Sequence, residues 1–408
     1  MVRGGADWEV TPLELSALEG GGMPHLSPAE DGGVILSWLA PAEPDEGGVA
    51  GGGGEGGTTS NRLSRLRVVR YDPVSGFGEP RTVVQRDDFF VNWADFPSVV
   101  EVSPGTWVAH WLQRGPAGGY DYGVRVATSV DQGTSWSEPW IPHEDRSPTE
   151  HGFVTTWADG EGGWGAVWLD GRRYADGDHG PATEEMTLRT RAVSAGGDAG
   201  PEQELDARVC DCCQTDVALA ARGPVIVYRD RSSEEVRDIH VVRWEEGAWS
   251  APRAVHQDGW VIPGWPVNGP AIDARSDRVA VAWFAAPDDE PRVQIAFSQD
   301  GGATFAPPTR VDDGSPLGRA DVVLALDGSG IVLWLEETRN GEGELRLRRV
   351  DPDGSLGPSH VLSITRSARA SGFPQILPLD GETLFAAWTE ASDEGPVAVR
   401  VAHMELPR

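Results

Sequence analysis

The three cysteines of this chain are the residues whose spacing most clearly predicts chemistry. Cys210, Cys212 and Cys213 all fall within residues 210–213. Thiolates select Cu(I) or Zn²⁺, and a neutral imidazole often completes such a site. The cluster therefore predicts a metal site, for which the density of soft sulfur favours copper and leaves zinc as the alternative. Two other interpretations stay open: a disulfide within the cluster, and small buried side chains that pack the interior.

Three arginines form a second candidate group. Arg114, Arg172 and Arg231 each follow an aromatic residue that ends an apolar run. Planar guanidinium groups suit the recognition of carboxylate or phosphate, so the three are candidates for binding an anionic substrate. The alternative is that they form salt bridges with acids beside them, such as Asp170 and Asp230.

Carboxylates, tryptophans and one amide form the third group. Two facing carboxylates about 5–10 Å apart can hydrolyse a glycosidic bond. The candidate catalytic acids are Asp95, Glu150, Asp211 and Asp321. Tryptophan rings can stack on a sugar and an amide can hydrogen-bond it, although a tryptophan more often fills a core. The candidates for ligand binding are Trp93, Trp265 and Asn268.

These residues need a scaffold, and an internal repeat of roughly fifty to sixty residues supplies one. In each copy an apolar strand, a tight turn and a second strand ending in Trp, Tyr or Phe follow one another. The seven copies are residues 24–39, 97–112, 152–169, 214–228, 269–284, 320–335 and 374–388. Runs such as VILSWL and VAVAWF suit strands that are buried on both faces. A third and a fourth strand follow most copies, which is the pattern of a propeller blade.

The sequence therefore predicts an all-β fold, a seven-bladed β-propeller that spans residues 1–408 as a single domain. The seventh copy ends after three strands, so the N-terminal segment Trp8–Leu15 is expected to supply the fourth strand and close the ring. The alternative is a six-bladed ring with an extra hairpin. Residues 41–60 are rich in glycine and are expected to form a disordered surface loop, because they carry too little apolar surface to fold.

A ring of blades brings distant residues together at one mouth of its axis. The loops that enter the innermost strands and those that leave the second strands meet there, and loops on a common face usually carry function. His25 and His151 are expected at this mouth and are the candidate imidazole ligands of the cysteine site. A small molecule or glycan bound at the mouth is the expected ligand.

A turn motif relates the chain to a known family. Residues 129–136 read SVDQGTSW and residues 298–305 read SQDGGATF. Both fit the pattern Ser-x-Asp-x-Gly-x-Thr/Ser-Trp/Phe, in which the carboxylate accepts N–H bonds within the turn and Gly permits a positive φ. The chain thus resembles the sialidase-like Asp-box (BNR-repeat) propellers over nearly its whole length. The Phe/Tyr-Arg-Ile-Pro motif of true sialidases has no counterpart, since the first repeat begins Met23-Pro24-His25.

Composition excludes several classes of partner and of catalysis. The chain has 64 acidic residues, no lysine and a formal net charge of −30, so it repels nucleic acid, and lysine-based covalent catalysis is excluded. No apolar stretch is long enough to span a bilayer. The first ten residues lack the apolar core of a signal peptide. The resemblance favours an extracytoplasmic (periplasmic or secreted) location, with a cytoplasmic one as the alternative, and the oligomeric state stays open.

The favoured functional hypothesis is a sialidase-like propeller with a Cys/His metal site, copper in preference to zinc, that binds metal or supports oxidative chemistry. The first alternative is an exo-acting glycoside hydrolase of sialidase type that uses the arginines and carboxylates. The second is a non-catalytic ligand-binding or scaffold propeller. Whether the protein is an enzyme depends on which of these hypotheses holds.

Overall fold

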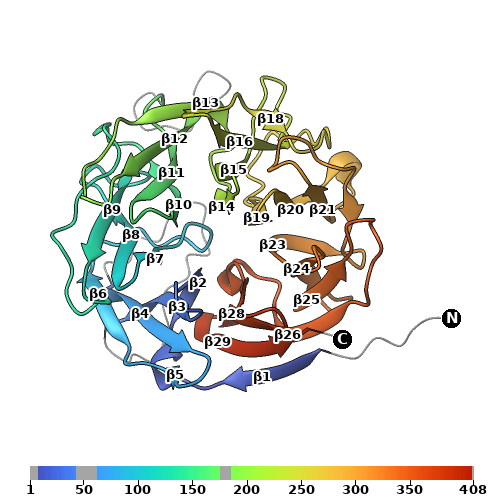
Figure 1. Ribbon diagram of the computed structural model, residues 1–408, viewed down its shortest axis with the longest axis horizontal. Helices are drawn as coiled ribbons and strands as arrows, with labels where there is room; N and C mark the ends of the chain where they lie inside the picture. The colour runs from blue at the N-terminus through green and yellow to red at the C-terminus, as the bar shows by residue number, and fades with distance from the viewer. Residues whose placement is uncertain (1–7, 43–61, 175–184, 407–408) are drawn as a thin grey trace.

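Seven antiparallel sheets surround a central axis in the computed structural model, which describes residues 8–42, 62–174 and 185–406 (Figure 1). The predicted all-β, seven-bladed propeller is confirmed. Helix is limited, in the described residues, to three short 3-10 turns: η1 (Ser16–Leu18), η3 (Pro287–Asp289) and η4 (Arg369–Ser371). The predicted glycine-rich loop lies almost wholly outside the described residues.

Each blade starts with a strand at the axis and continues outwards. Blade one consists of β2 (Gly22–Pro28), β3 (Val34–Pro41), β4 (Ser64–Asp72), β5 (Gly76–Phe77) and β6 (Arg81–Arg86). Blade two has β7 (Ser98–Ser103), β8 (Thr106–Arg114) and β9 (Tyr122–Ser129). Blade three has β10 (His151–Ala158), β11 (Trp164–Asp170), β12 (Met186–Val193) and β13 (Gln203–Val209).

The remaining four blades repeat this order. Blade four has β14 (Asp216–Ala220), β15 (Gly223–Arg229), β16 (Ile239–Glu245), β17 (Ala248–Trp249) and β18 (Arg253–Ala254). Blade five has β19 (Ala271–Arg275), β20 (Arg278–Ala285), β21 (Arg292–Ser298) and β22 (Thr309–Arg310). Blade six has β23 (Pro316–Leu324), β24 (Gly330–Glu337), β25 (Glu342–Val350) and β26 (His360–Arg366). Blade seven has β27 (Gln375–Pro378), β28 (Thr383–Ser392), β29 (Gly395–Glu405) and β1 (Glu9–Leu13).

The hydrophobic core lies between adjacent blades. The second strand of blades one, three, five and six is almost entirely buried because its two faces pack against the blades on either side. Its terminal aromatic residue is fully buried in most blades, as for Trp38, Trp111, Trp168, Tyr228, Trp283 and Trp334. The apolar runs of the repeat thus become the layers between sheets.

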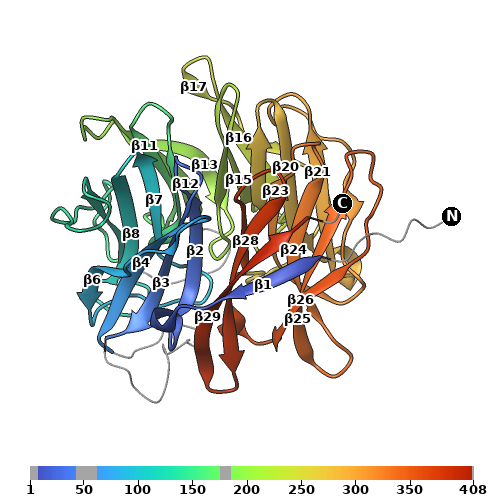
Figure 2. The same ribbon diagram turned by 60° about the horizontal axis from the view of Figure 1, so that its bottom comes forward.

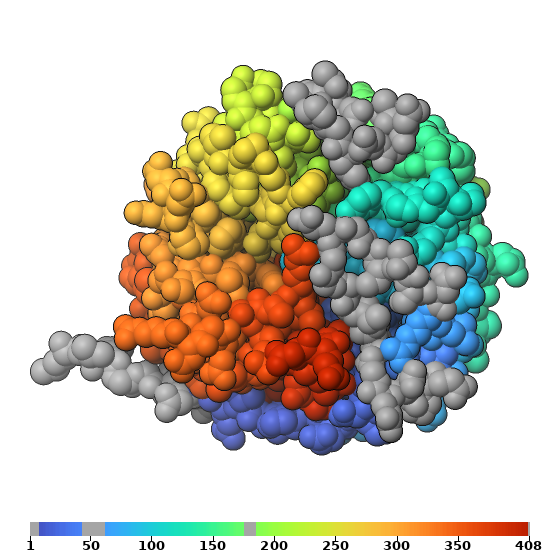
Figure 3. Space-filling model, turned by 180° about the vertical axis from the view of Figure 1, so that it is seen from behind, coloured from blue at the N-terminus to red at the C-terminus, as the bar shows by residue number. Residues whose placement is uncertain are grey.

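The two ends of the described chain meet in blade seven. Strand β1 pairs with β29 in antiparallel register, from Glu9 opposite Glu405 to Leu13 opposite Val401. The blue N-terminal strand and the red C-terminal strands lie side by side in Figures 2 and 3. Closure of the ring by an N-terminal strand, as predicted, leaves β29 paired on both sides.

Blade two departs from the expected four strands. The segment at residues 138–143, which was expected to form its outer strand, makes only the bridge between Val126 and Trp140. Pro139 and Pro142 flank Trp140. Because proline has no N–H to donate, neither residue can extend the ladder.

The Asp boxes of blades two and five share one hydrogen-bond pattern. In blade two, Ser129 Oγ donates to Asp131 Oδ1 over 2.8 Å and accepts the N–H of Gly133 over 2.8 Å. The corresponding distances in blade five are 2.8 Å from Ser298 to Asp300 and 2.9 Å from Gly302 to Ser298. Both glycines have positive φ. The motif is therefore a turn that joins the third strand to the outer part of the blade.

Side chains also link each innermost strand to the next around the axis. The carboxylates of Asp216, Asp273 and Asp321 accept the backbone N–H of Ile272, Leu324 and Ile376, one blade further on, over 2.7–2.8 Å. Gln375 accepts the N–H of Leu26 across the closing junction over 2.6 Å. These bonds hold the blades in register at the axis. None of the helices described could cross a bilayer.

Candidate metal centre

The cysteine cluster lies on the loop that leaves blade three and enters blade four. It follows the outer strand β13 and precedes the inner strand β14. The Cys210 N–H bonds to the carbonyl of Arg229 over 2.9 Å, which fixes the start of the loop against β15. Cys210 and Cys213 are each 1 % exposed, and Cys212 is partly buried. The loop therefore carries its sulfurs into the protein between the two blades.

The three sulfurs converge. Their Sγ atoms lie within 4.8 Å of one another, and those of Cys210 and Cys212 are 3.7 Å apart. A disulfide needs about 2.05 Å, and all three thiols are free. A tetrahedral ion with metal–sulfur bonds of about 2.3 Å holds its sulfurs about 3.8 Å apart. The donor set and its spacing therefore fit a thiolate-bound ion.

Two buried guanidinium groups accompany the sulfurs. Arg229 is 1 % exposed and donates to the carbonyls of Asn268, Arg237 and Phe284. Arg237 is 2 % exposed and is paired with Glu235 over 2.8 Å, while its Nη1 has no hydrogen-bond partner among the described residues. These two arginines supply positive charge beside thiols that would otherwise resist ionisation.

The electrostatics of the three thiols differ. Burial raises the pKa of Cys210 to about 12. Burial acts in the same direction on Cys213, but hydrogen bonds with the other two thiols and the charge of Arg229 outweigh it and lower the pKa of Cys213. Cys213 is thus the sulfur best placed to be a thiolate, the form that binds metals.

Three of the four predicted catalytic acids gather beside this centre. Asp95, Glu150 and Asp211 are 3 %, 4 % and 8 % exposed. Gly152 and Gly171 leave them room, since a Cβ at Gly152 would lie 2.2 Å from Asp95 Oδ2 and one at Gly171 would lie 3.1 Å from Glu150 Cγ. These acids, which are far apart in sequence, are thus neighbours in the structure.

Burial and mutual repulsion keep these acids protonated. Burial raises the pKa of Asp95 to about 7. The pKa of Glu150 is raised well above its usual range, first by burial and then by the charges of Asp211 and Asp95. Burial and Cys210 raise the pKa of Asp211. Tyr122 lies against the group, with its hydroxyl 3.5 Å from Asp95 Oδ2. These raised pKa values reduce the negative charge that the three acids place beside the sulfurs.

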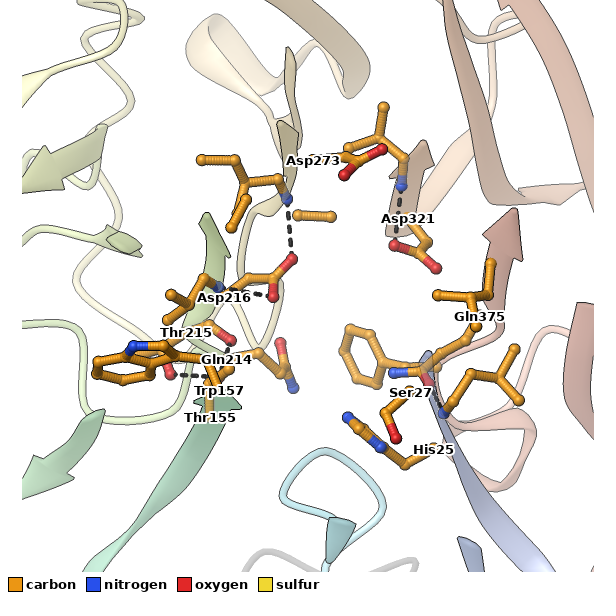
Figure 4. A pocket seen from close by; sticks show the side chains of 18 of the residues that line it. His25, Ser27, Thr155, Trp157, Gln214, Thr215, Asp216, Asp273, Asp321 and Gln375 are labelled. Carbon is orange, nitrogen blue, oxygen red and sulfur yellow. Dashed lines mark hydrogen bonds between the residues drawn. The ribbon is translucent and has the colours of Figure 1, made fainter. Parts of the chain in front are cut away.

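Asp321, the fourth predicted acid, stands apart in an axial pocket of about 430 Å³ (Figure 4). It faces the pocket together with Asp216, Asp273, Gln214 and Gln375. Its Oδ2 accepts the Ile376 N–H and its Oδ1 the Val322 N–H, over 2.7 and 2.8 Å. Asp321 is thus one of the carboxylates that link the blades, and burial raises its pKa to about 8.

The two predicted imidazole ligands lie outside the sulfur group. His151 packs on His143, with ring centroids 4.0 Å apart, and its Nε2 lies 3.1 Å from Asp145 Oδ2. His25 lines the axial pocket, where its ring faces Phe96 at 6.3 Å. The ligand atoms found within 4.8 Å of one another at the centre are the three sulfurs alone, among the described residues.

The predicted arginine clamp is dispersed. Arg172 pairs with Asp170 and Glu202 over 2.6 Å each, and Arg231 pairs with Glu235 over 2.9 Å. Arg114 donates to the carbonyl of Phe89 and lies over the Phe90 ring. These three side chains are thus occupied within their own blades, which agrees with the salt-bridge alternative for Arg172 and Arg231.

The predicted ligand-binding side chains are also separated. Trp93 stacks on Phe373 and beneath the Arg319 guanidinium, 4.7 Å from its ring centre. Asn268 is 9 % exposed, and its Oδ1 accepts the Arg319 N–H over 2.7 Å. Trp265 is 58 % exposed. Trp93 and Asn268 therefore belong to the packing around Arg319, and Trp265 alone offers an open ring.

Two arginines that interact electrostatically with the sulfurs were not among the predicted site residues. Arg229 ends the second strand of blade four, and Arg237 begins the stretch before the third strand. A guanidinium at the end of an otherwise apolar strand was the available signal for Arg229. Arg237 gave none, because its place depends on how the loop at residues 230–238 returns to the sheet.

Comparisons with known proteins identify the fold alone. No family model matches the chain, and no curated protein matches it. Among solved structures, the BP39L lectin from Burkholderia pseudomallei is 12 % identical with a TM-score of 0.58, covering 92 % of this chain and 94 % of the lectin. Polysaccharide lyase Uly1 is 10 % identical with a TM-score of 0.54, covering 94 % and 89 %. A protein of unknown function from Dyadobacter fermentans is 15 % identical with a TM-score of 0.53, covering 98 % of each chain. Membership of the Asp-box family stays a prediction.

Proposed function

We propose that this propeller binds a soft metal ion, Cu(I) in preference to Zn²⁺, through Cys210, Cys212 and Cys213. The observation that carries the proposal is the convergence of three free sulfurs within 4.8 Å of one another in a buried loop. Soft thiolate ligands select Cu(I), and within the described part of the chain no imidazole or carboxylate joins the three sulfurs in their group. Structural zinc sites almost always have four protein ligands, so the donor count favours copper.

Charge balance supports a thiolate-bound cation. A buried charge is tolerated only when it is paired. The Arg229 guanidinium is buried and donates to three backbone carbonyls, so a metal–thiolate group of net negative charge would balance it. The charge of Arg237 is shared with Glu235.

The axial pocket supports a second part of the proposal, a small-molecule or glycan ligand. Its volume of about 430 Å³ falls in the range of small-molecule sites. Asp95 and His25 line it, and Asp95 interacts electrostatically with Glu150 near the metal centre. A ligand in the pocket would thus lie close to the carboxylates that adjoin the sulfurs.

Copper titration under anaerobic, reducing conditions tests the metal proposal. We expect one Cu(I) per chain in competition with a chromophoric Cu(I) chelator, and a tighter complex than with Zn²⁺. Cys213→Ser should lower the affinity by more than about 100-fold, since outer-shell changes alone cost about 10–100-fold. The triple variant with serine at positions 210, 212 and 213 should bind no stoichiometric copper.

The controls separate loss of ligands from loss of fold. Circular dichroism should show the same β-sheet signal in the wild type and the serine variants. His151→Gln should bind copper as the wild type does, because its ring is engaged with Asp145. Less than a tenth of an equivalent of Cu(I) on the wild-type chain, or a disulfide in the protein as purified, would overturn the proposal.

A further inference from the structure

A second group of potential ligands lies near the cysteine loop, on strands of blades three and four. Asp206 belongs to β13, Asp230 directly follows β15, and His240 belongs to β16. One ligand atom from each lies within 4.8 Å of the other two. Pairing of Val209 with Asp230 and of Tyr228 with His240 sets this arrangement, so three strands contribute to one small polar site.

The spacing within this group suits an ion better than direct contact. His240 Nε2 and Asp230 Oδ2 are 3.6 Å apart, which is longer than a hydrogen bond. Two ligands of a tetrahedral ion with bonds of about 2.1 Å lie about 3.4 Å apart. The other ring nitrogen of His240 is shielded from solvent and has no hydrogen-bond partner among the described residues. The pair is therefore positioned as two ligands of one ion would be.

Surrounding groups orient the site and leave the Arg208 charge shared between it and two glutamates. The Tyr228 hydroxyl donates to Asp206 Oδ2 over 2.5 Å, and the Arg208 N–H donates to Asp206 Oδ1 over 3.1 Å. The Arg208 guanidinium lies 3.9 Å from Glu185 and 3.6 Å from Glu235. A hydroxyl that fixes a carboxylate is a usual feature of the outer shell of a metal site.

The protonation states agree with this geometry. Burial and then the charge of Asp206 raise the pKa of Asp230 to about 7, and a bound cation would favour the ionised form of this carboxyl. Burial lowers the pKa of His240, which leaves the imidazole neutral and able to bind a metal. The side chains of His240 and Asp230 stay 22 % and 18 % exposed, so solvent ligands and an ion can reach them.

We propose that Asp206, Asp230 and His240 form a binding site for a divalent first-row cation of the Mn²⁺ and Zn²⁺ class. Two carboxylates and one imidazole are a hard to borderline donor set, unlike the three soft sulfurs of the neighbouring centre. Three protein ligands leave positions for water, as in open metal sites. This site is independent of the proposed copper function and would make the propeller a carrier of two different metals.

Mn²⁺ is the best probe for this site, because it binds weakly to thiolate ligands and its electron paramagnetic resonance signal reports binding directly. We expect one bound Mn²⁺ per wild-type chain and a rise in melting temperature with Mn²⁺ concentration. Asp230→Asn and His240→Gln should each weaken binding at least tenfold. Zn²⁺ should displace Mn²⁺ from the protein with serine at all three cysteine positions, since Zn²⁺ binds N/O ligands more tightly than Mn²⁺ does.

Glu336→Gln is the matched control. Glu336 stands two residues after Trp334 in blade six, as Asp230 stands two residues after Tyr228, but it accepts the Trp334 N–H and has no place in the ligand group. This variant should bind Mn²⁺ within twofold of the wild type. Absence of Mn²⁺ and Zn²⁺ binding in the wild type, or equal binding in the wild type, Asp230→Asn and His240→Gln, would overturn the proposal. Loss of copper alone, with Mn²⁺ retained, would count only against the cysteine centre.

Discussion

At the scale of single residues, the candidate centre depends on how thiols and guanidinium groups share one buried volume. Cys210, Cys212 and Cys213 bring little charge as long as burial keeps two of them protonated. A bound cation changes this, because thiolates replace thiols and release their protons. Arg237 can then compensate the added charge, because its guanidinium interacts electrostatically with Cys210 and its Nη1 has no hydrogen-bond partner among the described residues.

Arg237→Gln tests this compensation. The variant keeps a hydrogen-bonding side chain but removes the positive charge, so Cu(I) affinity should fall about tenfold, within the range seen for outer-shell changes. Competition with a chromophoric Cu(I) chelator measures the affinity of the variant. Arg243→Gln is the control, because Arg243 lies further along in β16, is also buried and pairs with a glutamate, Glu245, but is not among the groups whose charge acts on the thiols. Equal copper affinity in Arg237→Gln and the wild type would show that this arginine has no part in the site.

At the scale of elements, side chains of the innermost strands hydrogen-bond each strand to the next around the axis. Asp216, Asp273 and Asp321 occupy equivalent positions in three consecutive blades, and each carboxylate accepts one N–H in its own strand and one in the next. Burial raises their pKa values to about 7, 6 and 8. The three protons are therefore released in the unfolded chain at a much lower pH than in the folded ring.

A pH dependence of stability follows. A carboxyl with a raised folded-state pKa binds more protons folded than unfolded, so its contribution to stability is lost as pH rises from its unfolded pKa to its folded one. For Asp321 that window runs from about 3.8 to about 8. In Asp321→Asn the side chain at position 321 is an amide and does not titrate. The free energy of unfolding of this variant, relative to the wild type, should therefore increase between pH 4.5 and pH 8 and level off above.

Urea denaturation at several pH values measures this difference. Asp380→Asn is the control, because Asp380 is an acid in an exposed turn of blade seven with hydrogen bonds to Glu382 and Thr383. Its difference from the wild type should change little with pH over the same window. Parallel stability curves for Asp321→Asn and the wild type would contradict the assignment of a raised pKa to this carboxyl.

At the scale of the whole molecule, the ring is closed by backbone pairing between chain ends rather than by a covalent link. Strand β1 supplies five paired residues to blade seven. Trp8, directly before it, is 7 % exposed and packs in the core cluster between blades six and seven. Without this segment, β29 would be an open edge and the adjoining core would be exposed.

Trp8→Ala tests the closure. Removal of a buried Trp side chain usually costs about 3–5 kcal/mol, so the variant should unfold at a clearly lower temperature and at lower urea concentration than the wild type. Thr11→Ala is the control, because Thr11 lies in the same strand with an exposed side chain. Size-exclusion chromatography should also show association of the Trp8→Ala chains through the loosened edge. Equal melting temperatures of the two variants would show that Trp8 contributes little to holding the ring closed.

The repeat of apolar strand pairs in the sequence determines the architecture. Blade number, the order of strands and the closing role of residues 8–15 follow from local hydrophobic patterning, because a two-sided sheet can bury such runs only between similar sheets. The cysteine cluster could also be predicted from the sequence, because its three residues lie close together in the chain. Asp95, Glu150 and Asp211 lie close together because they occupy corresponding loops of adjacent blades.

Only the tertiary structure decided which side chains surround the sulfurs. The direction of a side chain at a strand end depends on register and on competing partners, which spacing in the sequence does not encode. Thus His151 turns to Asp145, Arg172 turns to Asp170, and Arg237 reaches the centre from a loop. The meeting of Asp206, Asp230 and His240 likewise depends on how β13, β15 and β16 align, because hydrogen bonds between strands, and not chain proximity, bring those three groups together.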